Sequence, residues 1–201
     1  MTIDLQKFLR TRRSIRHFRL EPVPESILKQ ILETATYAPS AHDKQPWRFV
    51  VLTTSEAKSR LAKAITGKFL LDMTKDGIST DKIRDRLEQT IRRINEAPVI
   101  IILCRDITQI NFQPNTHSQQ AEETMGVQSV AVAGLQLLLS AHAEGLGATW
   151  ICWPLFAAEE LSKALDLPSD WKPQGMVFLG YPDEEPSPSS RKPIQEIVRY
   201  L

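Results

Sequence analysis

The stretch from Ala121 to Glu144, AEETMGVQSVAVAGLQLLLSAHAE, constrains the fold more than any other part of the sequence. Its apolar residues recur at helical spacing over about 24 residues, which corresponds to roughly 36 Å of α-helix, the width of a small domain. They spread around most of the helical wheel, so we expect a helix that is buried on several sides and meets water only at its ends. Such a helix can serve as a core and also as a subunit interface. The apolar positions are Met125, Val127, Val130, Val132, Leu135, Leu137, Leu138 and Leu139.

A membrane-spanning helix is the alternative interpretation of this stretch. A span needs about 18 or more consecutive apolar residues. Polar residues interrupt the run well short of that length, at Gln128, Ser129, Gln136, Ser140 and His142. The pattern therefore favours a core helix, and we expect no membrane partner.

Length and charge narrow the class of protein further. A chain of 201 residues favours one domain over two small ones, so we predict a single domain spanning residues 1–201. Apolar residues make up 42% of the chain and charged residues 24%, as in ordinary folded proteins. The net charge of +1 gives no overall field that attracts nucleic acid, and we expect no such partner. Residues 1–13 lack the apolar core of a secretory signal, which favours a cytoplasmic location.

The cysteines and histidines do not suggest a metal site. Cys104 and Cys152 form no CxxC pair, and within apolar stretches they are expected to be buried free thiols. His17, His117 and His142 lack the HExxH pattern or any other two-ligand spacing. We therefore predict that no metal ion is bound.

A cluster of arginines near the N-terminus is the first candidate binding site. Residues 3–10 are expected to form a short helix, and the segment 11–16, TRRSIR, follows it. Guanidinium groups bind phosphate oxygens in pairs and a serine hydroxyl adds a further donor, so this cluster suits a phosphate monoester. A solvated basic turn is the alternative, because runs of charge usually lie on the surface. The candidates are Arg12, Arg13, Ser14 and Arg16.

A loop stiffened by two prolines is the second candidate site. An apolar helix face from Ile27 to Ala35 ends at Pro39, and a strand is expected from Arg48 to Thr53. Between them lies SAHDKQPW, whose prolines restrict the backbone and can hold its polar side chains in place for a ligand. A plain connection between helix and strand is the alternative.

The remaining pattern alternates helices with strands. We expect helices over 55–66, 81–97 and 157–167 and strands over 98–104, 148–152 and 175–181. The segment 67–80 is expected to be a lid or a mobile connection. Gly145-Leu146-Gly147 is expected to end the long helix, while Trp47 and Trp171 are expected to serve packing. The last residues, 194–201, are too apolar for a free tail, so some partner surface should cover them.

Four motifs in this order resemble the FMN-dependent nitroreductase family. They are RRSIRHF, then APSAHDKQPWRF, then GLGATWI after the long helix, and finally LGYP followed by SRKP. Within that family, GLGATWICWPLF, LDLPSDWKPQGMVFLGYP and RKPIQEIV are most similar to the branch typified by the flavin domain of the coenzyme F420 ligases. The resemblance extends from Phe8 to Val198 and implies an α+β fold, an α/β sandwich in which helices flank a central mixed sheet. It also implies a homodimer in which each C-terminus crosses onto the other subunit.

The resemblance assigns roles to the candidate residues. The arginine cluster would hold the phosphate, ribityl chain and pyrimidine edge of FMN, with Arg191 of SRKP approaching the phosphate from the other end of the chain. The proline-flanked loop would reach the flavin across the dimer interface through Ser40, His42 and Gln45. Backbone N–H groups near flavin N5 would come from Trp150, Ile151, Cys152 and Trp153. The substrate face would be shaped by Trp153 and Phe156.

The activity implied by the resemblance is a ping-pong NAD(P)H oxidoreductase. NADH or NADPH reduces FMN and leaves, and a planar electrophile such as a nitroaromatic or quinone then takes the hydride. Since hydride passes through flavin N5, no side chain is expected to be catalytic. Asp43 departs from the asparagine usual in related loops, and an ionised carboxylate cannot donate a hydrogen bond, so its contact with the flavin stays open.

Two other functions remain open. One is reduction of a deazaflavin of the F420 type or conversion of a flavin-derived substrate. The benzimidazole synthases of the superfamily are a weaker match, because they carry an aspartate within the arginine cluster where this chain has Ser14. The other is a non-catalytic flavin-binding module.

Overall fold

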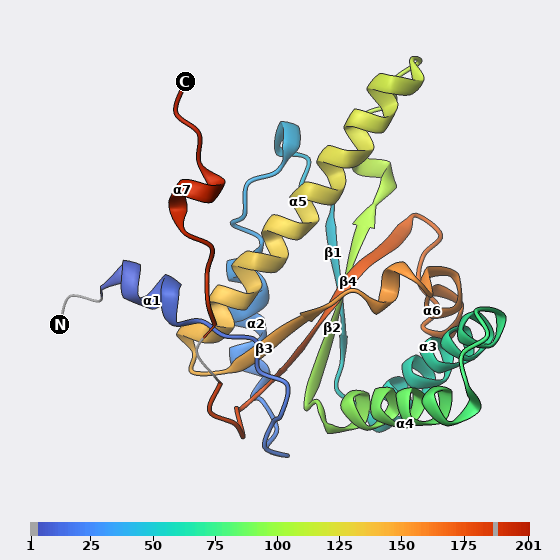
Figure 1. Cartoon of the computed structure of the whole chain (residues 1–201). Helices are drawn as coiled ribbons and strands as arrows, with labels where there is room; N and C mark the ends of the chain where they lie inside the picture. Colours follow the sequence, from blue (N-terminus) through green and yellow to red (C-terminus); the bar gives the residue numbers. More distant parts are fainter. Residues whose placement is uncertain (1–3, 187–188) are drawn as a thin grey trace.

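The computed structural model describes residues 4–186 and 189–201 (Figure 1). The helices are α1 (Leu5–Thr11), α2 (Glu25–Ala35), α3 (Ser55–Lys75), α4 (Thr80–Glu96), α5 (Thr116–Ala143), α6 (Ala158–Ala164) and α7 (Ile194–Ile197). The strands are β1 (Trp47–Leu52), β2 (Val99–Asp106), β3 (Gly147–Ile151) and β4 (Trp171–Gly180). Short 3₁₀ turns are η1 (Ala41–Asp43), η2 (Ile107–Gln109) and η3 (Trp153–Leu155).

The four strands form one sheet in the order β1-β2-β4-β3, and all three neighbouring pairs are antiparallel. The α+β prediction is confirmed, but the mixed sheet is corrected. The hairpin of α3 and α4 returns the chain to the end of the sheet at which β1 finishes, where Leu52 pairs with Ile100, so β2 must run the opposite way. Parallel pairing in the described residues is limited to an isolated bridge between Ser14 and Ala148.

Helices cover both faces of the sheet and produce two hydrophobic cores. Side chains of β2 alternate between them: Ile101 and Leu103 face α2 and α5, whereas Ile100 and Ile102 face α3, α4 and α6. Figure 1 shows these two layers of helices on opposite sides of the sheet. The alternation explains why β2 is a continuous apolar run, as expected for a strand buried on both faces. That residues 1–201 make up one domain stays a prediction.

Helix α5 is longer and more exposed than the sequence suggested. It begins at Thr116, where the Asn115 side chain accepts hydrogen bonds from the N–H groups of His117 and Ser118. One side packs in the first core, but Val127, Val132 and Leu135 are 41%, 39% and 50% exposed. The expectation that water reaches only the helix ends is therefore wrong, because this chain covers α5 on one side only.

The polar residues of α5 do not by themselves exclude a membrane-spanning helix. An 18-residue window of α5 has a mean hydropathy of 1.4, which is apolar enough to cross a membrane. Half of that window is buried inside the molecule, and Val130, Ala133 and Leu137 are fully buried against the sheet and α2. These contacts are typical of the core helix of a folded domain.

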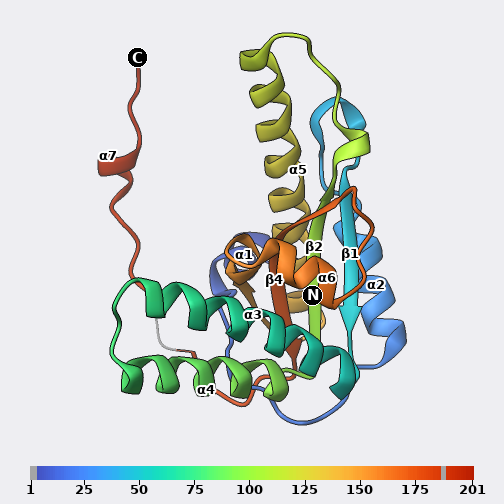
Figure 2. The ribbon, with the colours of Figure 1, turned by 90° about the vertical axis from the view of Figure 1, so that its right-hand side faces the viewer.

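The segment 67–80 is mostly helical, so the mobile connection expected there is wrong, whereas a role as a lid stays a prediction. Helix α3 continues through Gly67 to Lys75, and a short turn with Gly77 at φ +71° leads into α4 (Figure 2). Phe69 in this extension packs edge-on against Trp153, with ring centroids 6.0 Å apart. This contact joins residues far apart in sequence, which local pattern does not reveal.

Trp150 is packed between two glycines. A Cβ atom on Gly134 of α5 would lie 2.1 Å from Trp150 Cζ3, and one on Gly175 of β4 would lie 2.4 Å from its Cζ2. The position of the indole ring therefore requires glycine at both sites, and the ring sets the distance between α5 and the sheet.

We expect Gly134→Ala to destabilise the protein by about 1–3 kcal/mol, because the ring has no room to move away. Gly67→Ala is the matched control. It lies in α3, where an added Cβ atom would meet nothing within 4 Å, so the better helix propensity of alanine should raise stability by about 0.5–1 kcal/mol. Urea unfolding gives the free energy of unfolding of both variants. An equal change in that free energy for Gly134→Ala and Gly67→Ala would contradict the account.

Candidate functional site

Both ends of the chain contribute arginines to one cavity of about 430 Å³, called here the arginine cavity. The N-terminal segment brings four of the predicted residues, and Arg191 comes from the segment after β4. The lining residues are Arg12, Arg13, Ser14, Arg16, Glu184, Pro186, Ser189 and Arg191. The structure thus brings together residues that are far apart in sequence.

Backbone pairing holds these two segments side by side. The N–H of Arg19 donates to the carbonyl of Tyr181 at 2.9 Å, and the N–H of Asp183 donates to the carbonyl of His17 at 3.0 Å. On the other side of the same segment, the N–H of Ile15 donates to the carbonyl of Ala148 in β3 at 3.1 Å. Residues 14–19 therefore lie as an extended segment between β3 and the chain that follows β4.

The arginine cavity is strongly electropositive. Burial, and then the positive charges of Arg13 and Arg191, lower the pKa of Arg12 below its ordinary value. Arg191 is oriented by bonds from Nη1 to Ser189 Oγ at 2.7 Å and to the Ser190 carbonyl at 2.9 Å. Because the positive charges of these arginines repel one another, the cavity favours the binding of an anion, which would reduce the repulsion.

Glu184 is the carboxylate within this cluster. Its Oε1 accepts hydrogen bonds from the backbone N–H groups of Arg16 and His17, the second at 3.1 Å. Burial alone would raise the pKa of Glu184, but these two bonds and the positive charges of His17 and Arg16 outweigh it, so the pKa is lowered. Glu184 therefore fixes the backbone from which Arg16 projects.

Arg93 of α4 is a candidate that the sequence analysis missed. Its guanidinium carbon lies 5.4 Å from the centroid of the Trp153 ring. Burial, followed by the charges of Arg16 and then Arg86, lowers the pKa of Arg93, and Arg16 itself lines the arginine cavity. No local motif distinguishes Arg93 from the other charged residues of α4, so only the packing of α4 identifies it.

The end of β3 differs from expectation in two side chains. Trp153 is only 8% exposed, because it packs edge-on against both Phe69 and Phe178 in the second core, so its side chain does not shape an open substrate face. Phe156 is 63% exposed and remains available. Cys152 is exposed rather than buried, and it accepts a hydrogen bond from Trp150 Nε1 at 3.2 Å.

Cys104 behaves as expected for a buried thiol. Its burial in β2 raises the pKa to about 12. Over the residues described, 4–186 and 189–201, no group of three His, Cys, Asp or Glu side chains is placed to hold a metal ion.

The proline-flanked loop lies against the middle of α5 rather than at the arginine cavity (Figure 1). Three of its residues have left-handed backbone angles: His42 at φ 53°, Asp43 at 52° and Gln45 at 47°. Such strain costs about 1–3 kcal/mol per residue, so the surroundings must hold the loop in place. Within one protomer, the loop residues Ser40, His42 and Gln45 do not join the arginines.

Helix α5 and the loop itself supply the bonds that hold this conformation. The Ala41 N–H donates to Ser129 Oγ at 3.1 Å, and His42 Nε2 lies 3.6 Å from Glu122 Oε1. Asp43 Oδ1 accepts from Gln45 Nε2 at 3.1 Å, so this carboxylate has a partner within the loop.

Comparison with known proteins identifies the family. The model of the nitroreductase family matches residues 9–181. The chain belongs to the nitroreductase family. The family predicted from the four motifs is thus confirmed, and with it an oxidoreductase.

Three similar proteins illustrate what this chain is related to. A Thermus thermophilus protein named NADH dehydrogenase is 30% identical over 220 residues, covering 98% of this chain and 95% of its own. The 5,6-dimethylbenzimidazole synthase of Rhodospirillum rubrum is 27% identical, covering 97% of this chain and 87% of its own. The crystal structure of a Desulfovibrio desulfuricans protein in complex with FMN has a TM-score of 0.77 and 26% identity, covering 100% of this chain and 98% of its own.

We expect Glu184→Gln to lower the melting temperature at pH 7 by about 2–4 °C, corresponding to a loss of about 1 kcal/mol when the charge-assisted bonds become neutral. Because the folded pKa of Glu184 is lowered, its contribution is complete above the unfolded carboxyl pKa of about 4.3 and is lost as the pH falls through the folded value. The difference between the proteins should therefore vanish in acid.

Thermal unfolding from pH 7 down to pH 3 tests this, with Glu185→Gln as the control at an exposed neighbour. A difference that persists unchanged at pH 3 would show that Glu184 acts through packing rather than charge.

Proposed function

We propose that this nitroreductase is an FMN-dependent NAD(P)H oxidoreductase that reduces planar electrophiles such as nitroaromatics or quinones. The observation that carries the proposal is the arginine cavity, in which guanidinium groups from both ends of the chain surround one space. Family membership supports the same reaction class.

The described residues fit FMN. Arg12 and Arg191 repel each other without an anion, and a phosphate monoester matches their donors. The hydroxyl of Ser14 and the guanidinium of Arg16 also line the cavity, and Arg93 continues the positive charge toward Trp153. Bound FMN would supply the redox chemistry, taking a hydride from NADH or NADPH at N5 and passing it to the acceptor.

The protein side chains bind and orient rather than react. Arg16 and Arg93 would stabilise an anionic reduced cofactor by their positive charge. Backbone N–H groups between Trp150 and Trp153 are proposed to lie near N5, and the exposed Phe156 offers an apolar surface for a planar acceptor. No proton-transferring side chain is required in this scheme.

We also propose a homodimer, in which the loop residues Ser40, His42 and Gln45 of one subunit complete the cofactor site of the other. The exposed apolar face of α5 supports this, since a second subunit would cover it. The C-terminal segment supports it as well: Ile197, Tyr200 and Leu201 are all highly exposed.

A groove suited to that C-terminal segment lies between α2 and β1. It has a volume of about 920 Å³, and its lining includes Leu28, Leu32, Phe49 and Val51. Strand β1 is at the edge of the sheet, so its outer backbone groups are free to pair with an added segment. The apolar C-terminal residues of a second copy would fill this groove.

The homodimer predicts a change of mass on mutation. We expect Ile197→Asp with Leu201→Asp to give a monomer of 22.8 kDa, whereas the wild type has twice that mass. A charge buried in an apolar groove costs several kcal/mol, which is enough to dissociate the subunits. Light scattering after size exclusion measures the mass, with Glu196→Gln as the control on α7. A wild type of 22.8 kDa would contradict the dimer.

A spectrum tests the proposed activity. We expect purified protein to carry flavin absorbance near about 450 nm that NADH or NADPH bleaches and a nitroaromatic restores. Arg12→Gln with Arg191→Gln should weaken FMN binding by at least about 100-fold, since each charge-assisted bond is worth roughly 1.5–3 kcal/mol. Lys192→Gln, which removes a neighbouring exposed charge, should retain the flavin. Tight binding by the double variant would overturn the phosphate assignment, and flavin that NAD(P)H does not bleach would favour a non-catalytic flavin-binding module.

The second candidate is action on a deazaflavin of the F420 type or on a flavin-derived substrate. Similarity to the Rhodospirillum rubrum synthase supports it. Incubation with reduced FMN and oxygen, or with F420 species, followed by mass spectrometry distinguishes the two. The cytoplasmic location stays a prediction.

A further inference from the structure

The guanidinium of Arg93 has no hydrogen-bond or ion-pair partner among residues 4–186 and 189–201. It is nevertheless half-buried, because α4 packs this side chain against the body of the protein. In the described residues, the buried side-chain nitrogens and oxygens that lack a partner are limited to Arg105 Nε, so the nitrogens of Arg93 reach the solvent. The N–H donors of Arg93 are therefore free to bind a ligand.

Trp153 holds the guanidinium of Arg93 in place. The guanidinium carbon lies 5.4 Å from the centroid of the indole ring. That ring packs edge-on against Phe69 and Phe178, with centroids 6.0 Å from each. A guanidinium that lies over an aromatic ring makes this contact with its flat face and keeps the N–H groups along its edge. Those N–H groups match the two oxygens of a carboxylate.

The positive charges in this region exceed the negative charges that FMN would bring. The arginine cavity contains four guanidinium groups, and Arg93, whose pKa is lowered by burial and then by the charges of Arg16 and Arg86, adds a fifth. A phosphate monoester carries about two negative charges, and the carboxylate of Glu184 adds one. Two positive charges then remain. An anionic reduced flavin would neutralise one of them, and the other is available to the acceptor that binds next.

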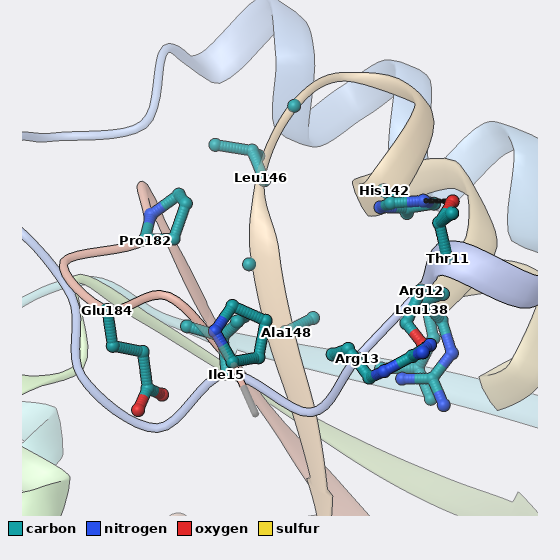
Figure 3. Close-up of a pocket in the computed structure, with 13 residues that line it drawn as sticks. Thr11, Arg12, Arg13, Ile15, Leu138, His142, Leu146, Ala148, Pro182 and Glu184 are labelled. Carbon is teal, nitrogen blue, oxygen red and sulfur yellow. Dashed lines mark hydrogen bonds between the residues drawn. The ribbon is translucent and has the colours of Figure 1, made fainter. Parts of the chain in front are cut away.

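Glu184 does not neutralise the arginine side chains directly. Its Oε1 accepts hydrogen bonds from the backbone N–H groups of Arg16 and His17. In the view of Figure 3, the Glu184 side chain and the side chains of Arg12 and Arg13 lie on opposite sides of Ile15. This carboxylate therefore serves the backbone of the N-terminal segment, and Arg93 keeps its charge unpaired.

Phe156 supplies an apolar surface on the same part of the chain. Its N–H donates to the carbonyl of Trp153 at 3.0 Å, so the turn η3 keeps Phe156 beside Trp153. The Phe156 side chain is exposed. An exposed aromatic ring and a cation with free donors thus both flank Trp153. Together they suit a flat ring that carries a negative group.

The position beside Trp153 assigns that negative group to the electron acceptor. The backbone N–H groups from Trp150 to Trp153 are those proposed to lie near flavin N5, where hydride is exchanged. NADH and NADPH would bring an uncharged carboxamide there on the nicotinamide ring, and a ribose separates this ring from the nearest phosphate. A negative group attached directly to the reacting ring therefore belongs to the acceptor.

We propose that Arg93 selects electron acceptors whose planar ring carries a carboxylate, and that it binds this carboxylate through the edge of its guanidinium. This inference rests on the proposed function, because the acceptor must reach a flavin that the arginine cavity binds. Arg86 lies seven residues earlier on α4, about 10 Å along the helix axis, so it adds positive charge without binding the same carboxylate.

Binding of para-nitrobenzoate and para-nitrobenzamide to the oxidised, FMN-loaded protein tests the selection, because the two probes differ in charge and hardly in shape. The change in the flavin spectrum gives each Kd without NADH present. The wild type should bind para-nitrobenzoate at least about tenfold more tightly than para-nitrobenzamide. Arg93→Gln should remove this preference and leave the Kd for para-nitrobenzamide within about twofold of the wild-type value.

Two further variants serve as controls. Arg93→Lys keeps the positive charge and should retain part of the preference for para-nitrobenzoate. Arg92→Gln removes an exposed charge from the neighbouring position of α4 and should behave as the wild type.

Each outcome decides the proposal. Equal affinity of the wild type for the two probes overturns it, and so does a preference that survives Arg93→Gln. If Arg93→Gln instead raises the KM for NADPH at least about tenfold, with the KM for NADH and both probe affinities unchanged, Arg93 binds the 2′-phosphate of the donor and the acceptor assignment is wrong. Flavin-loaded protein that NAD(P)H reduces but that binds both probes alike leaves the proposed function intact. If the protein binds no flavin, the proposed function and this inference fail together.

Discussion

Repulsion among guanidinium groups is the interaction on which the rest of the site depends. Arg12, Arg13, Arg16 and Arg191 line one cavity, and the burial and, after it, the repulsion that lower the pKa of Arg12 oppose their assembly. Backbone hydrogen bonds between residues 17–19 and 181–183 oppose that repulsion and hold the two ends of the chain together. An anionic ligand would remove the repulsion, so the geometry that folding imposes is also the geometry that binds phosphate.

The backbone pairing of the N-terminal segment also connects the site to the core. The segment that carries the arginines also pairs with β3, and Ile15 lies so close to Gly147 that a Cβ there would be 2.7 Å from the Ile15 side chain. Any change in the distance between α5 and the sheet, which Trp150 fixes, would therefore be transmitted to β3 and from there to the cavity wall. The position of the site follows from the packing of the domain.

Much of the fold followed from the sequence, because its helices and strands have clear periodicity. The apolar run of β2 and the long helix α5 were both expected, and α5 lies within a few residues of its predicted ends. The exposure of Val127, Val132 and Leu135 was not expected, because the spacing of apolar residues does not tell whether this chain or another covers a helix face. The extension of α3 was missed because its anchor, Phe69 on Trp153, is a contact between distant residues.

The candidate site was predictable where a motif carried it. RRSIR and SRKP pointed to the arginines that line the cavity, whereas Arg93 lies in an ordinary charged helix and only its packing on Trp153 distinguishes it. The substrate role of the Trp153 side chain was wrong because an aromatic residue after a strand can face either the core or the solvent. The contribution of Ser40, His42 and Gln45 stays a prediction, since it involves a second subunit.

The affinity of the flavin-free protein for FMN relative to riboflavin tests the central claim most directly, because the two differ only in the phosphate. If the arginines of both chain ends hold that phosphate, riboflavin should bind at least about 100-fold more weakly, and the advantage of FMN should shrink as salt is added. Equal affinity for the two flavins, independent of salt, would contradict the account.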